Sequence, residues 1–445
     1  MKFNFKLIAN ILGLLIMLNG GFMWICLPFS IYYREPVWHL LAAGAIAIAS
    51  GAIIWSSTQK DRNKELKKRD GYLIVTLGWL SMSFFGTLPF ILSGAIPDFT
   101  NAFFETISGF TTTGASILND IESLPKGILF WRSLTQWIGG MGIIVLAVAI
   151  LPILGIGGMQ LFVAEAPGIS PDKMKPRIKE VAKRLWFIYL GLTVAECILL
   201  MFGGMTFFDA INHSLTTMAT GGFSTKNASI AHYNSAYIQY VIILFMFLAG
   251  TNFTITYFGL KGKFSKVWQN EEFRNYLLLS VLLSIFIAFF VFSSNWEGFE
   301  KSFRDSLFQV VSIITTTGYI TADYTKWAPF LTVIFFLLMF VGASAGSTAG
   351  GIKIVRHTLL FKNSFLEMKR QLHPSAVIPV RHNGQAVSRD ITYNVLAFVM
   401  IYVLVYGVGV FLISFTGVDF NTALGAVATS LGNIGPGLGD VGPVN

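Results

Sequence analysis

Nine apolar stretches, each close to the length of a membrane span, constrain the fold of this chain more than any other feature. About 20 apolar residues in a helix cross the hydrocarbon core of a bilayer, and a helix satisfies its own backbone hydrogen bonds there. The first stretch is too long for a secretory signal and lacks an A-x-A-like cleavage site, so we expect it to be retained. The sequence therefore predicts an all-α polytopic membrane protein with spans at Leu7–Tyr32, Trp38–Trp55, Tyr72–Ala95, Phe130–Leu154, Leu185–Met205, Ala236–Leu260, Tyr276–Phe292, Trp327–Val341 and Ile391–Phe415.

Composition agrees with a membrane protein and excludes two other classes. Of the 445 residues, 54% are hydrophobic and 12% are charged. The net charge of +9 does not indicate nucleic-acid binding, because the basic residues lie in short loops between apolar stretches rather than on a solvated face. Cys26 and Cys197 both lie inside apolar stretches, so no disulfide framework or CxxC metal site is available.

Basic residues alternate from loop to loop and so predict the orientation of the spans. Most of the 32 Lys and Arg residues lie before the first span or in the loops 56–71, 165–184, 261–275 and 353–393. Positive residues that flank spans stay on the cytoplasmic side. We therefore expect a cytoplasmic N-terminus.

The opposite side of the predicted topology contains four repeats. Aligned without gaps on one glycine, they read NAFFETISGFTTTG (101–114), DAINHSLTTMATGG (209–222), DSLFQVVSIITTTG (305–318) and TALGAVATSLGNIG (422–435). The third, seventh and tenth positions are apolar in every copy, a spacing that marks one helix face. The first position can cap a helix, and the eighth carries a hydroxyl in each copy. The capping residues expected are Asn101, Asp209, Asp305 and Thr422, and the hydroxyl residues are Ser108, Thr216, Ser312 and Thr429.

Each repeat therefore predicts a helix of about ten residues that ends at a glycine. Such a helix rises about 15 Å, roughly half the hydrocarbon thickness, so it enters the membrane but has to turn back. Non-helical backbone at that depth is tolerated only where protein buries it or where it lines a water-filled path. Four re-entrant segments between spanning helices imply a central pathway.

The turns themselves, TTTGAS, ATGGFS, TTTGYI and GNIGPG, contain no charged side chain, so backbone carbonyls have to act as ligands. Rings of carbonyls replace the water shell of a potassium ion, and the negative ends of the helix dipoles favour a cation. Glycine is also common in membrane helices for close packing, and one TTTG alone would indicate little. Four copies in register favour a potassium pore. An anion pore would be expected to present helix N-termini or basic rings instead.

These turns, together with QWIGGMGIIVLAVAILP (136–152) and MKPRIKEVAKRLWFIYL (174–190), resemble the Trk/Ktr/HKT superfamily and, within it, the TrkH family of potassium-uptake proteins. The resemblance implies four membrane–pore–membrane repeats around one pore, in a homodimer in the inner (cytoplasmic) membrane. It also implies a TrkA-type nucleotide-binding ring as cytoplasmic partner. The chain has no Gly-rich phosphate fingerprint or other cofactor motif of its own, and K⁺ is expected as the transported ion.

The resemblance assigns a selectivity filter that binds potassium. Repeat two has adjacent glycines, and the gap-free alignment favours Gly222 over Gly221. Glycine at all four ring positions implies a preference for potassium, since the sodium-permeable branch of the superfamily has serine at the first. The filter residues expected are Thr113, Gly114, Gly221, Gly222, Thr317, Gly318, Ile434 and Gly435.

A run of small residues interrupts the returning helix of repeat three. Composition alone favours tight helix packing for such a run. The resemblance favours a gating loop beneath the filter, made of Gly342, Ala343, Ser344, Ala345, Gly346, Ser347, Thr348, Ala349, Gly350 and Gly351.

The expected organisation is a two-helix unit at 1–70, repeat one at 71–175, repeat two at 176–265, repeat three at 266–385 and repeat four at 386–445. Repeat four lacks the last spanning helix of the family pattern, so we expect the chain to be truncated. Glu105, Glu196 and His213 are interpreted as hydrogen-bonding or packing residues rather than ion ligands, although intramembrane carboxylates are functional candidates.

Three function classes are compared. A proton- or sodium-coupled potassium symporter is an alternative to a channel-like pore, and the sequence does not distinguish them. A secondary transporter of another solute would need converging polar side chains that these turns lack. The sequence contains no HExxH motif and no paired intramembrane carboxylates, two features that would indicate an enzyme.

Overall fold

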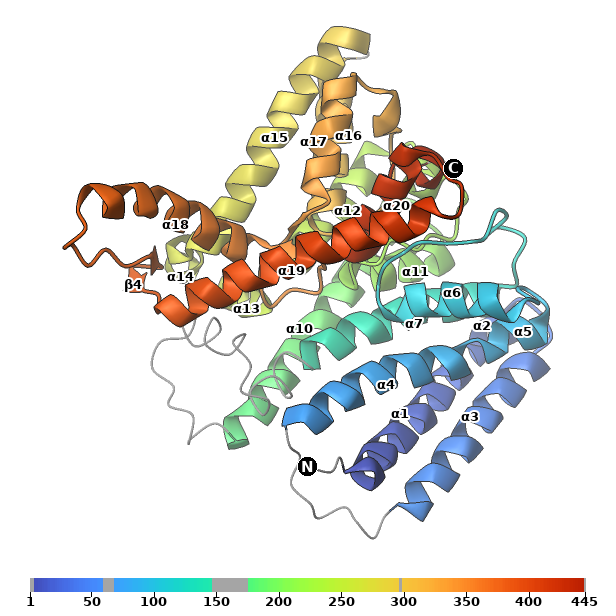
Figure 1. Ribbon diagram of the computed structural model, residues 1–445. Coiled ribbons are helices and arrows are strands. Elements are labelled where there is room, and N and C mark those ends of the chain that lie inside the picture. The colour runs from blue at the N-terminus through green and yellow to red at the C-terminus, as the bar shows by residue number, and fades with distance from the viewer. Residues whose placement is uncertain (1–3, 59–67, 146–174, 296–297, 444–445) are drawn as a thin grey trace.

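The computed structural model describes residues 4–58, 68–145, 175–295 and 298–443. The chain is mostly helical, and its helices pack side by side, as Figure 1 shows. The all-α fold and the apolar spanning helices expected from the sequence are confirmed.

Long apolar helices account for most of the expected spans. They are α1 (Phe5–Ile25) continued by α2 (Leu27–Tyr32), α3 (Trp38–Ser57), α4 (Lys68–Gly86) continued by α5 (Leu88–Ser93), α7 (Lys126–Val145), α10 (Lys175–Phe202), α15 (Glu271–Asn295) and α19 (Arg389–Ser414). The C-terminal end of the expected span Phe130–Leu154 lies outside the described residues.

Two expected spans differ from the prediction. The stretch Ala236–Leu260 is not one straight helix: α12 (Ala236–Ala249) and α13 (Phe253–Leu260) meet at an angle of 115°. The backbone breaks there because Gly250 and Phe253 bond to a neighbouring loop: Ser344 N–H donates to the Gly250 carbonyl (3.0 Å) and Phe253 N–H to the Gly346 carbonyl (3.2 Å). The stretch Trp327–Val341 forms only a short helix, α17 (Pro329–Leu338).

Four half-length helices occupy the aligned repeats: α6 (Phe99–Phe110), α11 (Phe207–Met218), α16 (Phe299–Ile314) and α20 (Phe420–Gly432). Their expected capping residues are wrong by several residues. The side chains of Asp98, Thr206 and Asp419 cap α6, α11 and α20, and each accepts a hydrogen bond from the N–H three residues later. α16 starts earlier still, after Gly298, without a side-chain cap. Polar residues recur within the first turn of each helix, so the gap-free alignment began one turn inside three of them.

Shorter elements complete the fold. They are α13, α14 (Phe264–Gln269), α18 (Ile354–Leu372), the 3₁₀ turns η4 (Ser229–His232), η5 (Tyr324–Lys326) and η6 (Gly439–Val441), the parallel pair β1 (Val341–Gly342) and β2 (Ile352–Lys353), and the hairpin of β3 (Arg381–His382) and β4 (Gln385–Ala386). In Figure 1, α13, α14 and α18 lie at the left, and α2 and α5 lie at the right.

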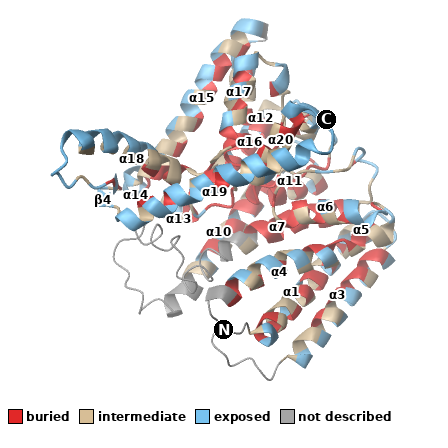
Figure 2. Ribbon diagram, viewed as in Figure 1, coloured by how far each residue is buried: buried red, intermediate tan, exposed pale blue. Residues whose placement is uncertain are grey.

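Burial follows the half-length helices. Figure 2 shows buried residues gathered along α11, α12 and α16, whereas α19 is largely exposed. Many large apolar side chains are exposed on the outer helices, among them Phe202, Phe289 and Phe411. Such surfaces suit lipid rather than water, because contiguous exposed apolar area is rare on soluble proteins.

Glycines bring α1 and α3 into backbone contact. A Cβ on Gly20 would lie 2.6 Å from the Gly44 carbonyl oxygen, and one on Gly51 would lie 2.5 Å from the Gly13 carbonyl oxygen. Close approach of this kind is how helices associate without a hydrophobic driving force in a bilayer.

We expect Gly20→Leu to separate α1 from α3 and lower the stability of the protein by about 1–3 kcal/mol, the usual effect of overpacking. The matched control is Gly21→Leu, since no atom lies within 4 Å of a Cβ at Gly21. Melting temperatures of the detergent-solubilised proteins measure the difference. Equal melting temperatures for the two variants would contradict the packing argument.

Candidate functional site: the four glycine turns

Each half-length helix ends in the same hydrogen-bonded turn. After α6, the N–H of Thr113 donates to the Ser108 carbonyl (2.9 Å) and the N–H of Thr112 to the Gly109 carbonyl (2.9 Å). This pair of hydrogen bonds is a Schellman motif, which satisfies the last carbonyls of a helix. The first of these bonds, from an N–H to the carbonyl five residues earlier, recurs in the other copies. It runs from Gly221 to Thr216, from Thr317 to Ser312 and from Ile434 to Thr429. We call these the first to fourth glycine turns, in chain order.

Every turn holds two residues in left-handed backbone geometry. The first of the two is not glycine: Thr112, Thr220, Thr316 and Asn433 have φ of 60°, 53°, 56° and 63°. A β-branched residue is a genuine outlier at positive φ and costs on the order of 1–3 kcal/mol, so the surroundings have to impose it. The second is a glycine in each turn, with φ of 82° at Gly114, 78° at Gly222, 80° at Gly318 and 101° at Gly435.

These four glycines, which we call the glycine ring, contact one another in cyclic order. A Cβ on Gly114 would lie 2.0 Å from the Gly221 carbonyl oxygen, and one on Gly222 would lie 1.9 Å from the Thr317 carbonyl oxygen. One on Gly318 would lie 2.0 Å from the Ile434 oxygen, and one on Gly435 would lie 3.0 Å from the Thr113 oxygen. Each turn thus places the carbonyl before its glycine against the glycine of the preceding turn, and the fourth returns to the first.

Gly222, rather than Gly221, has the geometry of the other three ring members. Its φ is positive and its α-carbon faces the next turn, whereas Gly221 supplies the preceding carbonyl, as Thr113 and Thr317 do.

Side chains of the half-length helices hold the turns in place. The eighth-position hydroxyls of Ser108 and Ser312 donate to the carbonyls just after the ring glycine, Ala115 (2.6 Å) and Tyr319 (2.7 Å). Neighbouring turns are also joined directly. Tyr319 OH donates to the His213 carbonyl (3.1 Å), and Asn433 Nδ2 donates to the Thr111 carbonyl (2.9 Å).

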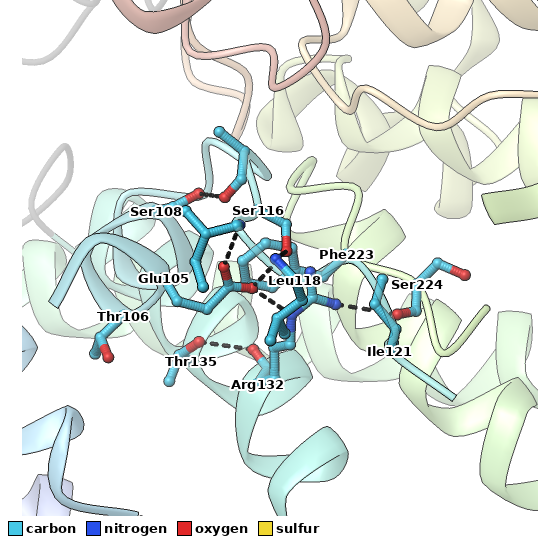
Figure 3. Close-up of polar contacts among 12 residues, drawn as sticks. Glu105, Thr106, Ser108, Ser116, Leu118, Ile121, Arg132, Thr135, Phe223 and Ser224 are labelled. Atoms are coloured by element: carbon cyan, nitrogen blue, oxygen red, sulfur yellow. Dashed lines mark hydrogen bonds and ion pairs between the residues drawn. The ribbon is translucent and has the colours of Figure 1, made fainter. Parts of the chain in front are cut away.

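A buried ion pair joins the first and second turns, as Figure 3 shows. Glu105 and Arg132 lie 2.6 Å apart and are almost fully buried. Glu105 accepts hydrogen bonds from the Ile117 N–H (3.0 Å) and the Ser116 hydroxyl (3.0 Å), just after the first turn. Arg132 donates to the Ser224 carbonyl (3.0 Å), just after the second. The hydrogen-bonding role expected for Glu105 agrees with these contacts.

The small-residue loop, residues 342–351, lies directly against the ends of the half-length helices. Thr348 donates to the Met218 carbonyl at the end of α11 (3.1 Å), and the Gly350 N–H donates to Thr316 Oγ1 (2.6 Å). A Cβ on Gly350 would lie 2.7 Å from the Gly432 carbonyl oxygen. The β1–β2 pair closes the loop at its base, and Glu272 accepts from the N–H groups of Ala345 within the loop (2.8 Å) and Val355 just after it (3.2 Å).

A cavity of about 510 Å³ lies beside the segments that leave the glycine turns. Residues that follow the first three turns line it, including Asn119, Asn227, Thr321 and Asp323. Partial burial would raise the pKa of Asp323, but hydrogen bonds from Thr325 and Lys326 and the charge of Lys326 bring the pKa below its ordinary value. The carboxylate therefore stays ionised at neutral pH and pairs with the Lys326 ammonium, 3.2 Å away.

All eight residues expected at the filter lie at the four turns, and the ten-residue loop expected as a gate lies against them. Sequence reasoning missed the residues that support these segments, above all Arg132, Gln136, Glu272 and Asn433. Arg132 and Gln136 are polar residues inside the expected span Phe130–Leu154. That position was a usable signal, because intramembrane charges are seldom without a role.

Fold and site together define a polytopic membrane protein whose half-length helices meet at a ring of backbone. The profile of the TrkH family, described as a cation transport protein, matches residues 38–443. The Trk system potassium uptake protein TrkH of Salmonella typhimurium is 43% identical over 433 residues, which cover 96% of this chain and 89% of that protein. TrkG of Escherichia coli K12, also a Trk system potassium uptake protein, is 34% identical and covers 95% of this chain and 88% of its own length.

The crystal structure of the potassium transporter TrkH from Vibrio parahaemolyticus superimposes with a TM-score of 0.90 at 39% identity, covering 98% of this chain and 92% of that one. The chain belongs to the TrkH family of cation transport proteins.

We expect Glu105→Gln to destabilise the protein by about 3 kcal/mol or more, since it leaves the Arg132 charge buried without its partner. Melting temperature in detergent measures the loss. The control is Glu300→Gln, which breaks the pair of Glu300 and Arg304; the Glu300 side chain is 60% exposed, so at most about 1 kcal/mol should be lost. A Glu105→Gln protein as stable as the control would contradict a tightly held pair.

Proposed function

We propose that this protein takes up potassium through a K⁺-selective, channel-like pore whose filter is the glycine ring and the carbonyls before it. The observation that carries the proposal is the cyclic order of the four turns, in which each ring glycine contacts the carbonyl before the next one. The names of the TrkH and TrkG relatives, all potassium uptake proteins, support potassium as the substrate.

The turns suit a cation for two electrostatic reasons. Each lies at the C-terminal end of a helix of 12 to 16 residues, where the helix dipole is negative. The residues that supply the filter carbonyls, Thr113, Gly221, Thr317 and Ile434, carry no charge, so the backbone has to replace the water shell of the ion.

We propose that the small-residue loop gates the pore beneath the glycine ring. Its contacts with Met218, Thr316 and Gly432 support this placement. Its base is fixed by the β1–β2 pair, and Glu272 holds Ala345 within the loop, so opening the loop would break the bonds of Thr348 and Gly350.

We also propose a cytoplasmic N-terminus in the inner membrane, a homodimer, and a TrkA-type nucleotide-binding ring as regulatory partner. The positive loops 261–275 and 353–393 support a docking surface for such a ring, and the relatives are parts of a Trk system. In the third positive loop, 165–184, the residues 165–174 lie outside the described residues, and 175–184 belong to α10. The units at 1–70, 71–175, 176–265, 266–385 and 386–445 stay predictions.

Gly114→Ser should lower the preference for potassium over sodium by about tenfold, which corresponds to about 1.4 kcal/mol in the difference between two binding free energies. The added Cβ would collide with the Gly221 carbonyl, and the backbone there has φ +82°. Relative potassium and sodium flux in liposomes measures the preference. The control is Gly94→Ser, which meets the same backbone strain at φ +73° with no atom within 4 Å. An unchanged flux ratio for Gly114→Ser would reject the filter assignment.

Thr348→Val should raise basal potassium flux up to about fivefold, because it removes a hydrogen bond worth about 1 kcal/mol between the small-residue loop and α11. The ratio of potassium to sodium flux should stay the same, since the filter is untouched. Thr256→Val on α13 is the control, because its hydroxyl donates to the carbonyl of Asn252, the residue that caps the same helix (3.3 Å). Reduced flux, or a changed ion ratio, would count against a gate.

A further inference from the structure

We infer that Arg132 and Gln136 of α7 position the second glycine turn, and that the cation preference of the pore depends on them. The inference rests on the proposed function, because it takes the four turns as the filter. Both residues act through residues 221–224, so they are positioning residues rather than ion ligands.

Gln136 uses both ends of its amide on the second turn. Its Nε2 donates to the Gly221 carbonyl (2.7 Å), and its Oε1 accepts from the Phe223 N–H (3.1 Å), so the amide brackets Gly222. The side chain is fully buried. Losing either bond would leave a buried polar group unsatisfied, which is costly. The two bonds therefore fix the turn relative to α7.

The amide of Gln136 fills the space that a threonine side chain has in the first and third turns. Thr113 and Thr317 place their hydroxyls 2.8 Å from those of Thr111 and Thr315, which braces each turn from within. Gly221 has no side chain for such a brace. A Cβ there would lie 2.4 Å from Gln136 Cδ. The second turn is therefore braced from outside, by a residue of α7.

This brace also changes one filter carbonyl. Four residues supply the filter carbonyls. Within the part of the chain that the structure describes, the Gly221 oxygen is the one of these four that accepts a hydrogen bond from a side chain. The donor occupies one of the two lone pairs and so weakens that carbonyl as an ion ligand. Since the number and field strength of carbonyls bear on the choice between potassium and sodium, this bond should affect the preference directly.

Arg132 lies one helical turn before Gln136 on the same face of α7. Its guanidinium lies over the Phe223 ring, 3.6 Å from the centroid, and donates to the Ser224 carbonyl, as Figure 3 shows. Its other partner, Glu105, holds the segment after the first turn. Arg132 therefore fixes the spacing between the two segments that leave the first and second turns.

The test is a double-mutant cycle on Gln136 and Gly221, with the full-length chain in liposomes and the ratio of potassium to sodium flux as readout. Gln136→Ala should lower the ratio at least fivefold. Gly221→Thr should also lower it, because the threonine collides with Gln136. In the Gln136→Ala background, Gly221→Thr should instead raise the ratio, since the space is then open and Gly221 has no positive φ.

A merely structural role would not move a flux ratio, which is independent of the amount of folded protein. The matched control is Gln239→Ala on α12, a buried glutamine that donates to the Tyr233 carbonyl away from the turns (3.1 Å). It should change the melting temperature without changing the ratio. Arg132→Lys should lower the ratio in an assembled protein, because lysine lacks the planar fork that reaches both Glu105 and Ser224.

Two results would overturn the inference. One is a Gln136→Ala ratio within twofold of the unsubstituted protein while Gly114→Ser lowers it, which leaves the proposed pore standing. The other is an equal effect of Gly221→Thr in both backgrounds. If neither Gly114→Ser nor Gln136→Ala changes the ratio, the filter assignment fails and the inference fails with it.

Discussion

The rest of the structure depends on one constraint, which is that non-helical backbone inside a membrane has to be satisfied by protein or by the ion path. Four helices end near one another, and each leaves carbonyls that no further helical turn can pair. Schellman bonds such as Thr113 to Ser108 satisfy some of them. The carbonyls before the ring glycines instead lie against the glycine of the preceding turn. Glycine is needed at these positions because the contact leaves no room for a side chain and the φ is left-handed.

The surrounding protein keeps this strained arrangement in place. Thr112, Thr220 and Thr316 would relax out of left-handed geometry if their neighbours allowed it. Bonds between turns, such as Asn433 to Thr111, oppose that relaxation from the side, and the small-residue loop opposes it from beneath through Thr316. The same loop sets the bend between α12 and α13 by bonding to Gly250 and Phe253. A rearrangement of the loop would therefore change both the glycine turns and the bend.

Sequence alone could predict the spans and the glycine turns, because apolar length and fourfold register are local patterns. The break at Gly250 was missed because residues 236–260 carry no charge and because the loop contacts, with residues 344–346, lie far along the chain. Asn252, which caps α13, was the local signal. The helix starts were misplaced by about one turn, since Asp98 and Asn101 are both acceptable caps by composition. Gln136 was missed for a related reason. Its amide fills the space left by the missing side chain of Gly221, and the two residues are far apart in the sequence.

The four turns are alike in backbone but differ in support, and this difference is informative. A symmetric pore could brace each turn in the same way, as Ser108 and Ser312 do for the first and third. The second depends on Arg132 and Gln136, while the side chain of Asn433 ties the fourth to the first. Since the ring closes only if all four turns hold their positions, each support is needed separately. If the glycine ring is the proposed filter, a change in a supporting residue acts on ion preference through its own turn, even where the ring glycines themselves are unchanged.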